Sequence, residues 1–322
     1  MNTAQAQLGA VLAAGGPALA RLLERTESRL AEVAESHGSE LGGHATGTLA
    51  AGGKRLRPVL VFLCGATRDD QRLVAAGAAV ELLHMATLVH DDVLDAAELR
   101  RGRPTVFAVA GRPGATATGD LLFSRAFALL AATGSEEAVR VLSAASSALA
   151  RGELMQRADA WNEEVIPERY LERCRLKTAS LFEASCRLGA LFGGRPDLAP
   201  ALGSFGEQVG LAFQMLDDVL DVSGPPERTG KPRGADLLDG TVTLPLILAR
   251  RVDPTLPGRV TTVAEAGAAS DRIAAAGVLE DARAQALAHV VEAKQSLSRL
   301  NLSVERLHAL SLVADGVVER YA

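Results

Sequence analysis

The sequence predicts an all-α single domain of roughly ten or more helices over residues 1–322. Ala, Leu and Val dominate a chain with only 3% aromatic residues, a balance that suits helices packed through small and branched aliphatic side chains. Long windows carry apolar residues at helical spacing, and no run of alternating β-branched residues predicts a sheet. No Pro/Ser-rich linker divides the chain, and residues 1–24 are a candidate for a loosely ordered N-terminal segment.

The first half of the chain alternates expected helices with connections marked by glycine. Residues 70–95 lack proline, contain a single glycine and carry a nearly continuous apolar face, which makes them the clearest long helix. Residues 37–53 are glycine-rich and predict a connection with at most a short helical turn. Gly102 and Pro104 mark a loop over 96–105. The helices expected here are 16–36, 58–67, 70–95 and 115–132.

The second half is also helical, apart from a polar, Gly/Pro-rich loop at 223–240. Glycine and proline residues punctuate the segments around it. The helices expected here are 136–161, 167–192, 198–222, 244–251, 260–275, 278–300 and 303–320.

Charge, cysteines and hydropathy exclude several classes of protein. The net charge of −5 is mild, and no block of Lys and Arg indicates nucleic-acid binding. Cys64, Cys174 and Cys186 form no CxxC pair, so a reducing compartment fits better than a disulfide framework. The N-terminal apolar stretch lacks the preceding positive charge of a signal peptide, and no window reaches about 18 uncharged apolar residues. We expect a cytoplasmic protein without a transmembrane segment, and contact with a membrane surface stays open.

The pentapeptide DDVLD occurs twice, starting at Asp91 and at Asp217, and each copy ends an expected helix. Residues four apart share a helical face, so Asp91 aligns with Asp95 and Asp217 with Asp221. Such like-charged pairs destabilise a helix, and the helix dipole disfavours acidic groups at a C-terminus. One copy could be a solvated helix end, but two copies that each follow an apolar run indicate a shared cation.

The ligand set favours magnesium over zinc. Carboxylate oxygens are hard ligands, and no Cys or paired His stands near them. Mg²⁺ binds one or two carboxylates, with water and a substrate phosphate completing its octahedron. Asp92 and Asp218 are rotated by about 100° from the leading aspartates and would serve less directly.

Basic residues accompany both acidic clusters. His84 lies seven residues, or two helical turns, before Asp91 and on the same face. Each of the others would alone be an ordinary surface charge, but together they suit two phosphorylated ligands, one held through Mg²⁺ and one directly. The set comprises Lys54, Arg55, Arg57, Arg100, Arg101, Arg103, Lys177 and Lys231.

Six motifs follow one another along the chain, and together they resemble those of the trans-isoprenyl diphosphate synthases, or polyprenyl synthetases. The resemblance covers about residues 25–322, essentially the whole chain. The motifs are GGKRLRP from Gly52, HxxxxxxDDVLDxxxxRRGxPT from His84, GD at 119–120, KTASLF from Lys177, FQMLDDVLD from Phe213 and GKPRGADL from Gly230.

This resemblance implies roles for the matching residues. Thr178 and Gln214 would lie near the reacting carbons and, with Lys177, form the catalytic group. The implied metal ligands are Asp91, Asp95 and Asp217, supported by Asp92, Asp218 and Asp221. The allylic diphosphate would be held by Arg100, Lys177 and Lys231, and isopentenyl diphosphate by Lys54, Arg57, His84 and Arg101.

The resemblance also implies the reaction and the architecture. An allylic carbon–oxygen bond breaks, the double bond of isopentenyl diphosphate attacks, and the leaving diphosphate takes the proton, so no dedicated base is needed. Three Mg²⁺ ions and the surrounding cations would stabilise the departing charge. The expected fold is an isoprenoid synthase-like bundle around a central cavity, in a homodimer.

The residues four and five positions before the first motif bear on product length. In short-chain members of the family an aromatic side chain near position −5 or −4 closes the product tunnel, whereas this chain has Ala86 and Thr87 there. The first motif also lacks the two-residue insertion of the bacterial farnesyl-type arrangement. We therefore expect a long all-trans polyprenyl diphosphate, of the kind that supplies quinone side chains, unless a neighbouring helix or the partner subunit blocks the tunnel.

Three alternatives remain from the sequence. They are a short-chain synthase making farnesyl or geranylgeranyl diphosphate, a class I terpene cyclase, and a non-catalytic subunit of a heteromeric synthase. GGKRLRP and the RRG after the first motif disfavour a cyclase, and the presence of both DDVLD copies disfavours a non-catalytic subunit. The chain departs from many family members at Thr241, where they have a lysine before TLP, which weakens one expected diphosphate contact.

Overall fold

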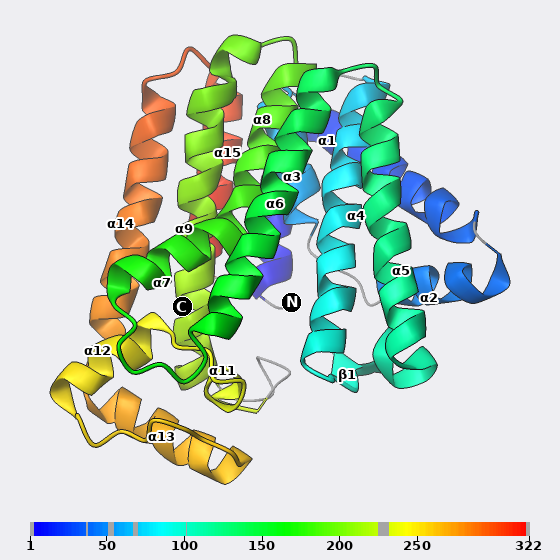
Figure 1. Cartoon of the computed structure of the whole chain (residues 1–322). Coiled ribbons are helices and arrows are strands. Elements are labelled where there is room, and N and C mark those ends of the chain that lie inside the picture. Colours follow the sequence, from blue (N-terminus) through cyan, green and yellow to red (C-terminus); the bar gives the residue numbers. More distant parts are fainter. Residues whose placement is uncertain are drawn as a thin grey trace.

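The computed structural model describes residues 3–36, 38–50, 55–66, 70–100, 102–224 and 232–319. Helices make up nearly all of these residues, which confirms the all-α prediction (Figure 1). In this described part of the chain, a single short hairpin pairs β1 (Leu99–Arg100) with β2 (Arg103–Pro104), inside the loop expected at 96–105. The longer α-helices are α1 (Thr3–Glu35), α2 (Ser39–Ala50), α3 (Leu56–Cys64), α4 (Gln71–Leu94), α5 (Val106–Ala131), α6 (Glu136–Ala158), α7 (Pro167–Cys174), α8 (Ser180–Phe192), α9 (Ala199–Ser223), α12 (Leu244–Val252), α13 (Val263–Ala275), α14 (Leu279–Ser298) and α15 (Val304–Glu319).

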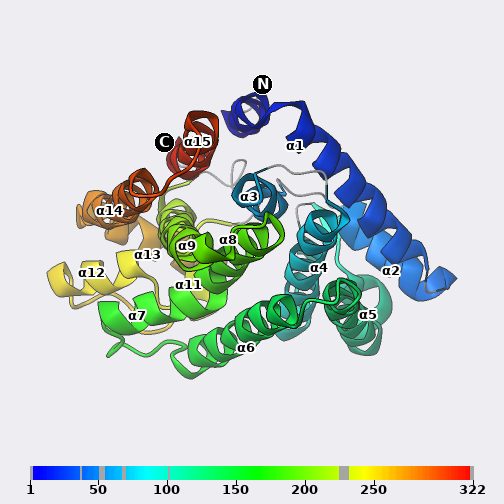
Figure 2. The ribbon, with the colours of Figure 1, turned by 90° about the horizontal axis from the view of Figure 1, so that it is seen from above.

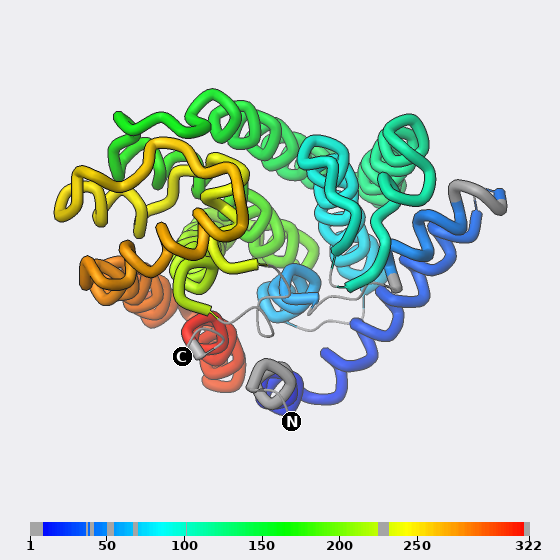
Figure 3. Tube along the Cα trace, turned by 90° about the horizontal axis from the view of Figure 1, so that it is seen from below, coloured from blue at the N-terminus to red at the C-terminus, as the bar shows by residue number. Residues whose placement is uncertain are grey.

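The bundle has an inner group of helices enclosed by the others. Figure 2 shows α3, α8 and α9 inside a ring that includes α1, α15, α14, α7 and α6. All residues of α3 from Pro58 to Cys64 are buried, and a helix that is apolar on every side belongs in a protein interior. Gly206 lets α9 approach α8, because a Cβ there would lie 2.6 Å from Phe182 O. Seen from below, α15 lies beside the first part of α1 (Figure 3).

Helix starts follow local capping chemistry. The Asp70 side chain accepts from the Arg72 N–H at the start of α4, and Thr105 accepts from Ala108 N–H at the start of α5. Thr262 and Glu265 form a reciprocal capping box at α13. These polar side chains satisfy N–H groups that the first helical turn leaves unpaired.

Helix α4 is long and apolar enough to cross a membrane by length and composition alone, with a mean hydropathy of 1.5 in its most apolar window. Of that window, 72% is buried inside the protein. Its apolar residues therefore serve the core, and it is the one described helix that meets those two criteria.

Three helices differ most from the sequence-based expectation. Residues 39–50 form α2 although they lie in the expected connection, because Ala45 is fully buried and Gly42 lets the helix approach α1, where a Cβ would lie 2.8 Å from Ala34 O. Helix α1 begins well before residue 16, with a break at Gly16, which has φ 71°. Helix α5 starts at Val106 and contains a break at Gly111, with φ 64°, where we expected only the later part.

Helices α4 and α9 end at the same end of the bundle. In Figure 1 α4 runs down to β1, and α9 runs down towards α11 (Ala235–Leu238), a short helix within the expected 223–240 loop. A π-helical turn, Arg175–Ala179, joins α7 to α8 within the helical segment expected at 167–192. Such turns are rare and recur at functional sites, so this end of the bundle is where a site is expected.

Candidate active site

The first acidic motif ends α4 and sends its side chains in two directions. Asp91 is half-buried and Asp95 is the C-terminal capping residue, and both border a cavity at this end of the bundle. Asp92 is buried and accepts from Arg100, whose Nε and Nη2 lie 2.9 and 2.8 Å from its Oδ1. Asp92 thus anchors a cation that also borders the cavity.

The second acidic motif, on α9, reaches the same cavity through Asp218. Asp218 is only 3% exposed and accepts from Tyr170 Oη and from Gln214 Nε2, each at 2.7 Å. Burial, with the negative charge of Asp236 added, raises the pKa of Asp218 to about 8. Asp217 and Asp221 are half-buried, and Asp221 Oδ2 accepts the Asp236 N–H at 3.2 Å.

The two motifs therefore border one cavity of about 150 Å³, although 126 positions separate them in the sequence. Its lining is predominantly polar and brings carboxylates together with cations and amides. It consists of Asp91, Asp95, Arg100, Gln156, Arg173, Cys174, Lys177, Thr178, Gln214, Asp218, Asp236, Asp239 and Thr241.

Lys177 enters the cavity from the π-helical turn. Its Nζ lies 3.2 Å from Gln156 Oε1 and forms an ion pair with Glu153, both on α6. Burial raises the pKa of Asp91 to about 6; Lys177 opposes this shift, whereas Glu153 adds to it. Gly152 makes this arrangement possible, because a Cβ there would lie 2.6 Å from the backbone N of Lys177.

Thr178 and Gln214 also meet at the cavity, as their expected shared role requires. Thr178 Oγ1 donates to Gln214 Oε1 at 2.7 Å, and the Gln214 amide donates to Asp218. Thr178 is 8% exposed, so this chain of hydrogen bonds is held in a nearly dry environment.

Several residues that line the cavity or contact its lining side chains carried no signal in the sequence. Arg157 on α6 donates from Nη2 to Asp95 Oδ1 at 2.5 Å and from Nε to Glu153 Oε1 at 2.7 Å. In the sequence, Glu153 and Arg157 are an i,i+4 pair like any on a solvated helix face. Tyr170 and Arg173 could have been suggested by their places seven and four residues before Lys177, but the π-helical turn between them shifts the helical register.

The residues expected to hold isopentenyl diphosphate are described only in part. Lys54 and Arg101, and the allylic-site candidate Lys231, lie outside the described residues. The Arg57 guanidinium lies 4.7 Å above the Phe182 ring, and burial lowers the pKa of Arg57 to about 10 while Glu81 opposes this shift. His84 is half-buried on α4, and its backbone O accepts from Thr87 Oγ1 at 2.7 Å. None of Arg57, His84, Asp217 and Asp221 is among the residues that line the 150 Å³ cavity.

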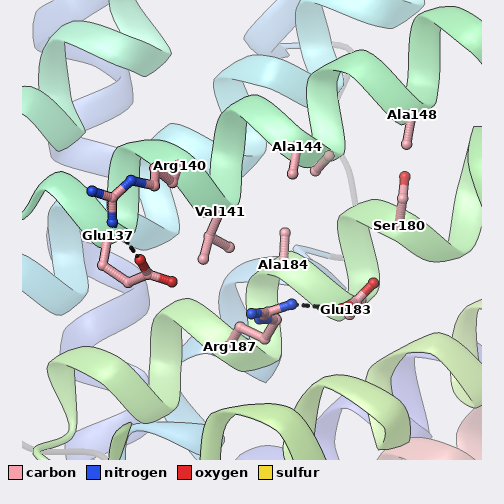
Figure 4. Close-up of a pocket in the computed structure, with 10 residues that line it drawn as sticks. Glu137, Arg140, Val141, Ala144, Ala148, Ser180, Glu183, Ala184 and Arg187 are labelled. Atoms are coloured by element: carbon pink, nitrogen blue, oxygen red, sulfur yellow. Dashed lines mark hydrogen bonds and ion pairs between the residues drawn. The ribbon is translucent and has the colours of Figure 1, made fainter.

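A second hollow lies between α6 and α8 and has different chemistry. It is an open groove of about 260 Å³ lined mainly by small residues such as Ala144, Ala148 and Ala184. Ion pairs Arg140–Glu137 and Arg187–Glu183 stand along it, each within one helix (Figure 4). With its charges already paired, this groove carries no catalytic constellation.

The oxygen-rich end of the 150 Å³ cavity fits a divalent metal that arrives with a phosphate. Within the described residues, no three His, Cys, Asp or Glu side chains converge as a ready-made metal cage. Asp91 and Asp95 of the first motif and Asp218 of the second instead offer hard oxygen ligands to one cavity, which Arg100 and Lys177 also line. This is the donor set of a site where Mg²⁺ keeps waters and shares substrate oxygens.

Comparison with known proteins agrees with this geometry. Residues 40–278 match the family model of the polyprenyl synthetases. Heptaprenyl diphosphate synthase component 2 of Geobacillus stearothermophilus is 42% identical over 266 residues, which cover 80% of this chain and 83% of that protein. Geranylgeranyl diphosphate synthase of Methanosarcina mazei is 37% identical over 281 residues, which cover 84% and 86%.

A solved structure gives the same result for the fold. The polyprenyl synthase from Caulobacter crescentus CB15, complexed with calcium and isoprenyl diphosphate, superposes with a TM-score of 0.86 at 34% identity and covers 95% of this chain and 98% of its own. The expected isoprenoid synthase-like bundle is thereby confirmed. By sequence and by fold, the chain belongs to the polyprenyl synthetase family of trans-prenyltransferases, which use a divalent metal with diphosphate substrates.

Proposed function

We propose that this chain condenses an allylic prenyl diphosphate with isopentenyl diphosphate, head to tail, into a long all-trans polyprenyl diphosphate. The observation that carries the proposal is the shared cavity, where Asp91, Asp95 and Asp218 stand beside Arg100 and Lys177. Carboxylates gathered at one polar cavity suit a diphosphate that binds together with divalent ions.

Magnesium, three ions in this proposal, would supply Lewis-acid stabilisation of the diphosphate leaving group. We assign its binding to Asp91, Asp95 and Asp217, with support from Asp92, Asp218 and Asp221. Arg100 and Lys177, with Lys231 outside the described residues, hold the allylic diphosphate. Asp92 fixes the Arg100 guanidinium, and Glu153 with Gln156 fixes the Lys177 ammonium, so both cations are oriented before substrate binds.

The neighbouring hydroxyl faces the carbon that becomes positively charged. The Thr178 hydroxyl donates its hydrogen bond to Gln214 Oε1. The lone pairs of Thr178 Oγ1 therefore stay available to face the allylic carbon. Asp218 holds the Gln214 amide in place from the other side. The leaving diphosphate takes the proton lost from the condensed product, so no side chain has to act as a base.

We assign isopentenyl diphosphate to Arg57 and His84, with Lys54 and Arg101. Arg57 Nε is buried and has no hydrogen-bond partner among the described residues. A buried guanidinium donor of this kind gains most from an anionic ligand.

The proposal of a long product rests on the small residues Ala86 and Thr87. Ala86 is fully buried and Thr87 half-buried on α4, so neither fills space with an aromatic ring. The relatives include both a heptaprenyl and a geranylgeranyl diphosphate synthase at similar identity. Product length is therefore a property to measure on this chain.

The decisive experiment is product analysis by the purified chain. It is incubated with Mg²⁺, radiolabelled isopentenyl diphosphate and, in turn, geranyl, farnesyl or geranylgeranyl diphosphate, and the products are separated by chain length. We expect products longer than four isoprene units, and a dominant product of three or four units would favour the short-chain alternative. Hydrocarbon or alcohol released from an allylic diphosphate alone would identify a cyclase.

An aromatic ring on the path of the growing chain should shorten the product. We expect Thr87→Phe and Ala86→Phe each to shift the product distribution towards fewer isoprene units, because a ring fills the space that the tail would enter. Thr87 is half-buried and tolerates the larger side chain better than fully buried Ala86. Thr87→Val, which adds no bulk, serves as the control, and an unchanged distribution in Thr87→Phe would place the block elsewhere.

The proposal includes a homodimer in a reducing cytoplasm. Three buried free thiols, Cys64, Cys174 and Cys186, support the reducing compartment. One relative is named as component 2 of a heptaprenyl synthase, so activity is measured on this chain alone and its mass by sedimentation. Activity without a partner would eliminate the alternative of a non-catalytic subunit.

A further inference from the structure

Arg173, on the last turn of α7, is a cation of the cavity that the family motifs leave without a role. It is 3% exposed and lines the cavity with Lys177 and Asp218. Its guanidinium lies 5.3 Å from the Tyr170 ring, and its Nη2 donates to Val242 O at 2.7 Å. Its Nη1 is buried and has no hydrogen-bond partner among the described residues.

The other two described cations of this cavity are already engaged by protein carboxylates. Arg100 donates to Asp92, and Lys177 pairs with Glu153. An arginine carries five N–H donors, and a buried donor left unpaired is destabilising, so an unpaired guanidinium nitrogen at a polar cavity indicates a missing acceptor. An anionic acceptor would satisfy this donor most strongly, because the guanidinium is permanently charged.

The neighbours of the Arg173 guanidinium indicate which part of the substrate it contacts. Val242, its backbone acceptor, follows Thr241, which lines the same cavity. The Thr241 N–H donates to Asp236 O at 2.8 Å, so this segment is fixed beside Arg173. Thr241 is uncharged, and Arg173 brings a positive charge to its neighbourhood from α7.

We propose that Arg173 binds the diphosphate of the allylic substrate through Nη1. The inference rests on the proposed function, because it assigns one further contact to the same diphosphate. Val242 O and the Tyr170 ring orient the guanidinium, so the donor is in place before the ligand arrives.

The test measures binding of inorganic pyrophosphate with Mg²⁺ to the full chain by calorimetry. Arg173→Met keeps the apolar stem but removes the charge, and its Kd for pyrophosphate should rise by about 10- to 100-fold, the usual range for a lost charged hydrogen bond. The KM for the allylic diphosphate should rise with it, while the KM for isopentenyl diphosphate stays unchanged. Arg175→Gln, which removes an exposed arginine two residues away, should leave all three values unchanged.

A second-site variant separates binding from a structural role. Thr241→Lys in the Arg173→Met background should recover at least about tenfold of the lost pyrophosphate affinity, because it restores a cation next to Val242.

Arg173→Lys keeps a positive charge but loses the forked donor of arginine, so it should bind pyrophosphate with intermediate affinity. This variant tests the contact even if Arg173→Met folds poorly. Wild-type affinity in Arg173→Met, or no recovery in the double variant, would overturn the assignment. Failure of the wild-type chain itself to bind pyrophosphate and make product would instead refute the proposed function.

Discussion

Asp91→Asn should lower kcat/KM by about 10³-fold or more, with the loss mainly in kcat. Asp91 is half-buried at the cavity, four residues before Asp95, and the amide removes a hard, charged oxygen from the side of the site where we assign Mg²⁺. Metal stabilisation of a leaving group is worth several kcal/mol, which corresponds to this factor. The measurement is steady-state turnover of an allylic diphosphate with isopentenyl diphosphate over a range of Mg²⁺ concentrations.

The matched control is Asp281→Asn, which makes the same chemical change on the exposed surface of α14. It should leave turnover and the Mg²⁺ dependence unchanged. Circular dichroism and thermal unfolding establish that both variants fold. If Asp91→Asn retains more than about a tenth of the activity, a difference of at most 1.4 kcal/mol, the metal-binding role assigned to the first motif is wrong.

The helices were predictable wherever apolar periodicity extended over several turns. The region of α4 was expected at 70–95 and is helical over Gln71–Leu94, because nearly every apolar residue in it is buried. The region of α2 was missed because its glycines have low helix propensity, and only the close approach to α1 in the structure explains one of them, Gly42. The π-helical turn at Arg175–Ala179 has no sequence signature, and its contact with α6 at Gly152 joins segments that are separate in the sequence.

The site was predictable to the extent that its residues repeat or match a motif. The DDVLD repeat predicted that two acidic segments share a cation, and Asp91, Asp95 and Asp218 do border one cavity. The i,i+4 rule alone ranked Asp217 ahead of Asp218, whereas it is Asp218 that lines the cavity and is held by Tyr170. Contacts such as Arg157 to Asp95 join residues 62 positions apart, and spacing along the chain carries no information about them.

Glu81 links α4 to the segment that contains the expected isopentenyl diphosphate ligands. Its side chain is 5% exposed, and its Oε1 accepts from Arg55 Nη1 at 2.7 Å. Arg55, which has a left-handed backbone with φ 47° at the start of α3, also pairs through Nε with Glu27 of α1 at 2.5 Å. The negative charge of Glu81 acts on Arg57 as well, so one buried carboxylate compensates two arginines.

Glu81→Gln should therefore lower the free energy of unfolding by about 3 kcal/mol, because the Arg57 charge then stays buried without compensation, whereas Arg55 keeps only its pair with Glu27. Urea-unfolding curves measure the change, and Glu32→Gln, which breaks the exposed Arg29–Glu32 pair on α1, should cost no more than about 1 kcal/mol. A loss below about 1 kcal/mol in Glu81→Gln would contradict a stabilising role for this cluster.

The same substitution removes the attraction between Glu81 and the Arg57 guanidinium, which holds that guanidinium in place. The KM for isopentenyl diphosphate should therefore rise in the folded Glu81→Gln variant, whereas Glu32→Gln leaves this KM unchanged.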